Sequence, residues 1–130
     1  MPAPRKRHGG DRDGGRSGWC RQTAEVELLL GTGRYIGVGE IGIDLYWDKT
    51  YLVQQQEAFR QQVRWAKQLA LPIVIHCRES FNEVLSIVEE EHDAALRGVF
   101  HCFTGTAAQE RASRTRCECR PALRRGAWFR

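Results

Sequence analysis

Short apolar runs alternate with helical stripes between residues 22 and 109, and this alternation limits the fold more than any other feature. From Leu52 to Ala70 the apolar residues recur at helical spacing, and the β-branched run "IVIHC" (73–77) then predicts a strand that is buried on both faces. A second helical stripe begins at Phe81, and "VFHCF" (99–103) predicts another strand. Strands and helices alternating at this spacing predict a parallel sheet.

The start of the same region adds one helix and one strand. "TAEVELLL" (23–30) predicts a short amphipathic helix that Thr23 caps and "GTGR" ends. "YIGVGEIGID" (35–44) predicts the first strand. The predicted order is therefore αβαβαβ, an α/β fold in which every strand ends at the same rim.

The two ends of the chain differ from the middle in charge. The whole chain carries a net charge of +4, but residues 1–21 alone carry +4 and residues 110–130 carry +5, which leaves −5 for residues 22–109. Both ends are rich in Arg and lack an apolar period, so we predict irregular segments, either disordered or translated out of frame. An alternative is that these Arg-rich ends bind nucleic acid.

Two further features concern the compartment. No apolar run reaches the ~20 residues of a membrane span, and the N-terminus lacks the apolar segment of a secretory signal, so we expect a cytoplasmic protein. The five cysteines form no C-x-x-C pair and are odd in number, which favours reduced thiols over a disulfide framework.

Glu40, His76 and His101 lie in or at the ends of the three predicted strands. If all three side chains face one rim, a carboxylate and two imidazoles form a ligand set for a divalent cation, and such an ion favours hydrolysis. In that case Cys77 and Cys102 face the surrounding helices as small apolar fillers, because neighbouring strand residues point to opposite faces. The alternative for each histidine alone is a hydrogen-bonded residue of the core or rim.

A competing motif overlaps the first strand. "GVGEIG" (37–42) satisfies the dinucleotide-binding pattern G-x-G-x-x-G, but that pattern should open a helix, whereas "IDLYWDKT" follows here. We therefore expect the glycines to let the backbone pass close to neighbouring groups.

Three segments, "VGEIGIDLYWD", "QQQEAFRQQVRWAKQLALPIVIHCRES" and "GVFHCFTGT", resemble the TatD family of metal-dependent hydrolases, deoxyribonucleases of the amidohydrolase superfamily. The resemblance implies a (β/α)8 barrel, of which residues 22–109 would form three to four units, and hydrolysis of DNA phosphodiesters with two divalent ions, Mg²⁺, Mn²⁺ or Zn²⁺. It implies that Glu40 bridges the ions, that His76 and His101 complete the shell of one, and that Arg78 contacts phosphate unless it pairs with Glu79 or Asp44. Asp44 is expected to form a turn or to hold a metal ligand in place rather than to bind the metal itself.

The sequence also departs from the family pattern. It has neither the H-x-H pair of the first barrel strand nor the later Asp ligand, and His8 and His92 are not expected to replace them. A full barrel needs ~250 residues, so the resemblance predicts an incomplete copy with impaired activity. The alternatives are an inactive fragment and a small nucleic-acid-binding protein that acts through its Arg-rich ends.

Overall fold

The computed structural model describes residues 14–101, 103–116 and 118–121 and divides the chain into two units, Met1–Arg34 and Tyr35–Arg130. The first unit contains helix α1, Gly14–Leu30. It ends where the sequence predicts, with the backbone N–H of Gly31 bonded to the Glu27 carbonyl at 3.1 Å and Gly33 at a φ of 71°. It begins nine residues before Thr23, so the predicted cap at Thr23 is wrong. Glycine lowers helix propensity by about 1 kcal/mol but does not forbid a helix.

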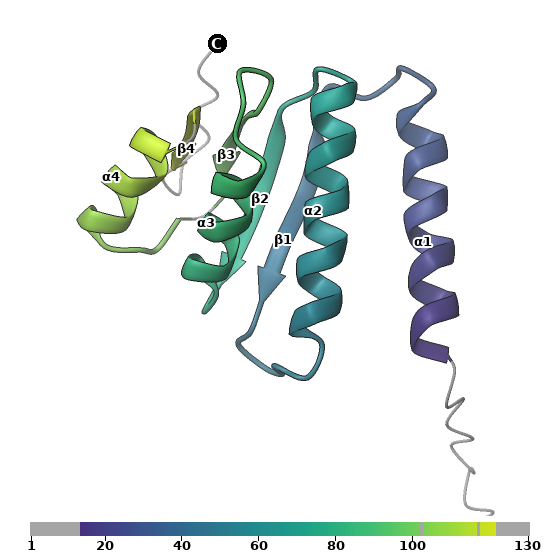
Figure 1. The fold of residues 1–130 in the computed structure, drawn as a ribbon, viewed down its shortest axis with the longest axis horizontal. Coiled ribbons are helices and arrows are strands. Elements are labelled where there is room, and N and C mark those ends of the chain that lie inside the picture. Colours follow the sequence, from purple (N-terminus) through teal and green to yellow (C-terminus); the bar gives the residue numbers. More distant parts are fainter. Residues whose placement is uncertain (1–13, 102, 117, 122–130) are drawn as a thin grey trace, which may run out of the picture. The chain divides into compact units, whose positions relative to one another are not determined.

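The second unit is a four-stranded parallel sheet in the order β1-β2-β3-β4, as Figure 1 shows. Its elements alternate along the chain: β1 Val38–Asp44, α2 Leu52–Gln68, β2 Ile73–Arg78, α3 Phe81–Glu90, β3 Arg97–Phe100, α4 Ala107–Arg116 and β4 Glu118–Pro121. The predicted α/β class and parallel pairing are therefore confirmed. No helix among the described residues is long and apolar enough to cross a membrane.

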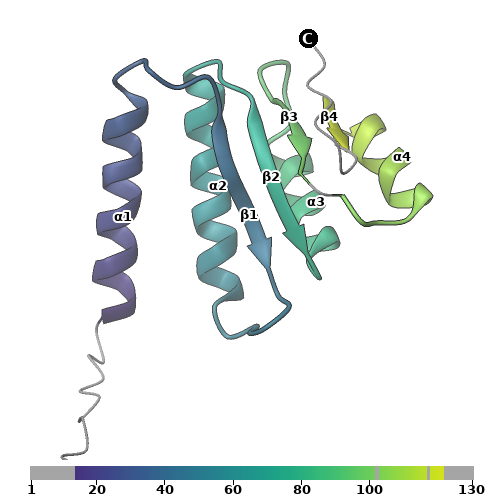
Figure 2. The same cartoon turned by 180° about the vertical axis from the view of Figure 1, so that it is seen from behind.

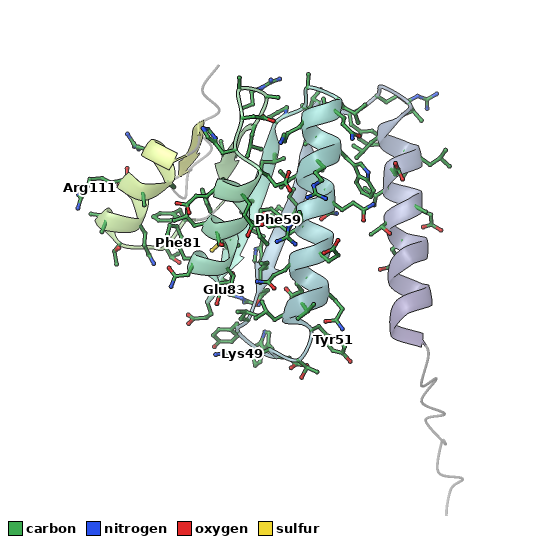
Figure 3. All side chains as sticks on the ribbon, in the orientation of Figure 1. Lys49, Tyr51, Phe59, Phe81, Glu83 and Arg111 are labelled. Carbon is green, nitrogen blue, oxygen red and sulfur yellow. The ribbon has the colours of Figure 1, made fainter. Side chains whose placement is uncertain are left out.

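Helices α2 and α3 cover one face of the sheet (Figure 1). The core lies in this layer, where fully buried side chains of the sheet meet those of the two helices. The largest of these side chains are Ile43, Phe59, Val63, Ile73, Ile75, Val84, Ile87, Val88 and Phe100. Figure 3 shows Phe59 on the side of α2 that faces α3 and the sheet.

The acidic end of α3 is paired rather than only solvated. Arg60 of α2 contacts Glu90 at 2.8 Å, and Arg64 contacts Glu91 at 2.7 Å. Lys67 contacts Asp93 at 2.7 Å. These ion pairs join the outer surfaces of α2 and α3, although pairs as exposed as these contribute little stability each.

Regular structure extends beyond the predicted boundaries. The expected irregular ends are wrong for residues 14–21, which belong to α1, and for residues 110–116 and 118–121, which belong to α4 and β4. Helix α4 begins with a capping box: the Gln109 N–H donates to Thr106 Oγ1 at 3.2 Å and the Thr106 N–H donates to Gln109 Oε1 at 2.9 Å. Residues 1–13 and 122–130 lie outside the described residues, and their predicted disorder stays a prediction.

Candidate metal centre

The face of the sheet opposite α2 and α3 carries the predicted site. Figure 2 shows the sheet in front of these helices. Along β2 the side chains alternate: Ile73 and Ile75 are buried against the helices, so His76 belongs to the other face. Gly42 of β1 pairs with His76, and Phe100 of β3 pairs with Ile75. The candidate residues therefore come from neighbouring strands at similar heights.

Glu40 reaches this face through an irregularity in β1. The register with β2 shifts between Gly39 and Ile41, so Glu40 is the extra residue of a bulge, a feature that redirects side chains near functional sites. His101 directly follows β3, and its N–H donates to the carbonyl of Ile75 at 2.9 Å. Glu40 Oε1 contacts His101 Nδ1 even though β2 lies between their strands. A carboxylate and an imidazole from β1 and β3 thus meet over β2.

His76 has a different partner. Its Nε2 lies 3.0 Å from Asp44 Oδ2. The same carboxylate accepts two bonds from Arg78, with Nε at 2.9 Å and Nη2 at 2.7 Å from Oδ2. The ion pair between Arg78 and Asp44 that the sequence left open is thus present. Asp44 also accepts from the Tyr46 N–H at 3.0 Å, which fixes the turn after β1.

The expected ligands share one face but form two pairs, Glu40 with His101 and His76 with Asp44. In the part of the chain that the structure describes, no three His, Cys, Asp or Glu side chains converge as a metal ion requires. The types of donor do fit a divalent cation, because imidazole nitrogen and carboxylate oxygen are its usual ligands. The geometry therefore supplies the donors of the expected set without their convergence on one point.

Asp44 is held from both its backbone and its side chain. The side-chain amide of Gln55 on α2 accepts from the Asp44 N–H at 2.8 Å and donates to the Asp44 carbonyl at 3.2 Å. The Arg78 guanidinium, assisted by the Tyr46 N–H and His76, holds the pKa of the Asp44 carboxyl far below its usual range. Gln55 was not predicted to matter; the run of Gln at the start of α2 was its only signal.

Because the pKa of Asp44 is lower in the folded state, its ion pair stabilises the fold fully above the unfolded pKa of about 3.9 and is lost as the pH falls below it. We expect Asp44→Asn to lower the free energy of unfolding at pH 7 by about 1 kcal/mol or less, since the pair is partly exposed. The difference from the unmodified chain should shrink between about pH 5 and pH 2. Denaturant titrations in EDTA measure it, and a constant difference across this range would contradict the assignment.

Cys77 faces the helices, as expected for a residue next to a histidine on the open face. It is a free cysteine, half-buried, and the Ser80 hydroxyl lies 3.7 Å from its sulfur. Burial raises the pKa of the thiol, so Cys77 is a neutral filler rather than a ligand. Cys102 lies outside the described residues.

The dinucleotide-binding alternative is wrong. Gly39 and Gly42 both lie within β1, Val38–Asp44, and the next helix begins only at Leu52, so no helix opens at the motif. Gly42 has a φ of 147°, and a Cβ there would collide with the carbonyl oxygen of His76. The close passage of backbone that the sequence predicted is therefore confirmed at this position.

Comparison with known proteins identifies the family and the fold of the chain. A sequence profile described as TatD related DNase matches residues 17–117. The chain is 42% identical over 84 residues to the "Uncharacterized metal-dependent hydrolase YabD" of Bacillus subtilis (strain 168), a match that covers 65% of the chain and 33% of that relative. It is 33% identical over 93 residues to the "3'-5' ssDNA/RNA exonuclease TatD" of Cronobacter sakazakii (strain ATCC BAA-894), covering 72% of the chain and 35% of that relative.

Two solved structures share the fold. YJJV, a TatD homolog from Escherichia coli k12, superimposes with a TM-score of 0.72 at 23% identity, covering 78% of the chain and 39% of YJJV. A hydrolase TatD family protein from Entamoeba histolytica gives 0.59 at 24% identity, covering 78% and 38%. The chain thus spans about one third of the length of the curated relatives and forms part of the α/β barrel. Because the profile takes in well over half of the 130 residues, the chain belongs to the TatD related DNase family.

Proposed function

We propose that this chain binds a divalent metal ion through Glu40, His76 and His101 and acts as a weak phosphodiesterase on DNA. The observation that supports the proposal most is the contact of Glu40 with His101, with His76 on the same face of the sheet. In that position the three strands supply one carboxylate and two imidazoles, a set suited to Mg²⁺, Mn²⁺ or Zn²⁺. Names that contain "metal-dependent hydrolase" and "ssDNA/RNA exonuclease" among the relatives support the same chemistry.

An ion bound there would lower the pKa of a coordinated water and polarise a phosphoryl oxygen. The residues of the chain would do the rest. Asp44 would hold the Nε2 atom of His76 and so orient the imidazole ring. The same carboxylate would fix the position of Arg78 at the end of β2. Arg78 would then donate to a phosphate oxygen of the substrate, exchanging part of its contact with Asp44 for a second charge-assisted bond.

We propose weak rather than full activity because the 130 residues contain neither an H-x-H pair nor the later Asp ligand of the family pattern. Each missing ligand costs positioning as well as charge at the reacting phosphate. An inactive fragment is the limiting case of this deficit. Nucleic-acid binding through the Arg-rich ends stays a prediction, since residues 1–13 and 122–130 lie outside the described part of the chain.

Metal titration by calorimetry tests the ligand set. Glu40→Ala, His76→Ala and His101→Ala should each weaken Mn²⁺ binding by more than the roughly 10- to 100-fold known for residues that only orient a ligand. His92→Ala is the matched control, because His92 is exposed and lies beyond the end of α3. If all four variants bound Mn²⁺ as tightly as the unmodified chain, the proposed site would be wrong.

Hydrolysis is tested separately with labelled single-stranded DNA, duplex DNA and single-stranded RNA in Mn²⁺. We expect slow cleavage of DNA that EDTA abolishes and that Glu40→Ala abolishes. Cleavage by the chain that survives either change would contradict the proposed roles of the metal ion and of Glu40, and absence of cleavage with the metal bound would identify an inactive fragment.

A further inference from the structure

Three aromatic side chains are exposed on the loop that joins β1 to α2. Trp47 is 83% exposed, Tyr51 57% and Tyr46 55%. The loop leaves β1 at Asp44, so the rings lie at the same end of the sheet as the candidate metal centre. Figure 3 shows Lys49 and Tyr51 on this loop. A folded chain usually buries much of the surface of such rings, so a group of exposed ones indicates a binding surface.

The loop is held in place by hydrogen bonds. The Leu45 N–H donates to the Arg78 carbonyl at 3.0 Å, and the Leu45 side chain is buried. The Tyr46 N–H donates to Asp44, and the Thr50 N–H donates to Asp48 Oδ1 at 2.8 Å. The first two bonds hold the start of the loop and the third forms a turn within it, so the aromatic rings are presented to solvent from a hydrogen-bonded segment.

The rings and Arg78 form a continuous group. The Tyr46 and Trp47 centroids lie 4.8 Å apart at an interplanar angle of 84°, an edge-to-face contact. The Arg78 guanidinium carbon lies 4.8 Å from the Tyr46 centroid. Tyr46 therefore connects the indole of Trp47 to a cation that already reaches the Asp44–His76 pair, while most of the indole surface is left to solvent.

We propose that Trp47, supported edge-on by Tyr46, is a stacking surface for a nucleobase of a single-stranded nucleic acid whose adjacent phosphate binds Arg78. The inference rests on the proposed function and extends it to the form of the substrate. Aromatic rings beside cations are the usual means of holding single strands, because every base has a face to stack. Bases of a duplex are already stacked on one another and do not offer that face.

The test is binding of a fluorescein-labelled oligothymidylate to the full chain in EDTA, followed by fluorescence anisotropy at low salt. Trp47→Ala should weaken binding roughly 5- to 150-fold, the range found when one stacking ring is removed. Trp47→Phe should restore most of the affinity because it keeps a ring. Ile36→Ala is the matched control: Ile36 is 90% exposed but precedes β1, at the opposite end of the strand, and its removal should change nothing.

A second probe separates base contacts from phosphate contacts. An oligonucleotide of the same length with abasic sites keeps the phosphates, so any binding that depends on phosphate charge alone is retained. The unmodified chain should bind it more weakly than oligothymidylate, and Trp47→Ala should bind the two probes equally. Equal binding of both probes by the unmodified chain, no detectable binding of oligothymidylate, or equal loss in Ile36→Ala would overturn the proposal. Since EDTA prevents turnover, these results do not depend on whether the chain hydrolyses DNA.

Discussion

Gly42→Ala is expected to lower the free energy of unfolding by about 2 to 6 kcal/mol. The new Cβ would meet the backbone carbonyl of His76, which cannot move away as a flexible side chain could, and overpacking of this kind costs about 1–3 kcal/mol. The φ of 147° adds about 1–3 kcal/mol because L residues rarely adopt it. Denaturant unfolding followed by circular dichroism measures the loss.

Gly37→Ala is the control for this change. Gly37 directly precedes β1. A Cβ added there would lie 3.2 Å from the Pro72 carbonyl oxygen, which is a tight contact but not a collision. We expect a loss of about 1 kcal/mol or less there. If Gly42→Ala were no more destabilising than Gly37→Ala, the close approach of β1 to β2 at the candidate metal centre would be wrong.

Phe59→Ala should cost about 3–5 kcal/mol, since it removes a fully buried aromatic ring between α2 and the sheet and leaves a cavity. For a domain whose total stability is typically about 5–15 kcal/mol, this loss is large enough to populate the unfolded state. The midpoint of urea unfolding, at constant m-value, measures it.

Val53→Ala provides the comparison on the same helix, because Val53 is 72% exposed and should change stability by about 0.5 kcal/mol or less. Equal effects of the two substitutions would show that α2 does not pack on the sheet through Phe59. A much smaller loss at Phe59 together with a lower m-value would indicate that the chain does not unfold in one cooperative step.

The sequence predicted the elements that carry strong apolar periods. Helix α2 was expected at Leu52–Ala70 and is found at Leu52–Gln68, with Ala70 turned to a φ of 54° before Pro72. Strand β2 was expected at 73–77 and spans Ile73–Arg78. Both succeed for the same reason: the buried residues recur at one period, so burial and local preference agree.

The elements outside that pattern were missed. Helix α4 carries few apolar residues, and its Arg content resembles an irregular tail. The capping box of Thr106 and Gln109 was the available signal for its start, since a Thr followed three residues later by Gln is typical of a helix N-terminus. Strand β3 spans Arg97–Phe100 rather than 99–103, and His101, which directly follows it, still donates its N–H to the Ile75 carbonyl of β2.

The face of the sheet on which the candidate residues lie was predictable, but the pairings of their side chains were not, and the metal site itself stays a prediction. Alternation along parallel strands places His76 on the open face, and this needs only the period of a strand. The bulge at Glu40 and the two bonds from Arg78 to Asp44 depend on the register of neighbouring strands and on side-chain reach. Exposed aromatics such as Trp47 carry no period at all, so nothing in the pattern distinguished them from core residues.

The most direct test of the proposed metal centre is a crystal structure of the chain grown with Zn²⁺, with the ion located by its anomalous scattering. We expect a peak on the open face of the sheet, about 2.0–2.2 Å from a Glu40 oxygen and from a nitrogen of both His76 and His101. That result would require the Glu40–His101 pair and His76 to come together around one ion, with His76 held by Asp44 through Nε2. A peak elsewhere on the chain, or no peak in crystals grown with excess Zn²⁺, would contradict the proposed metal centre.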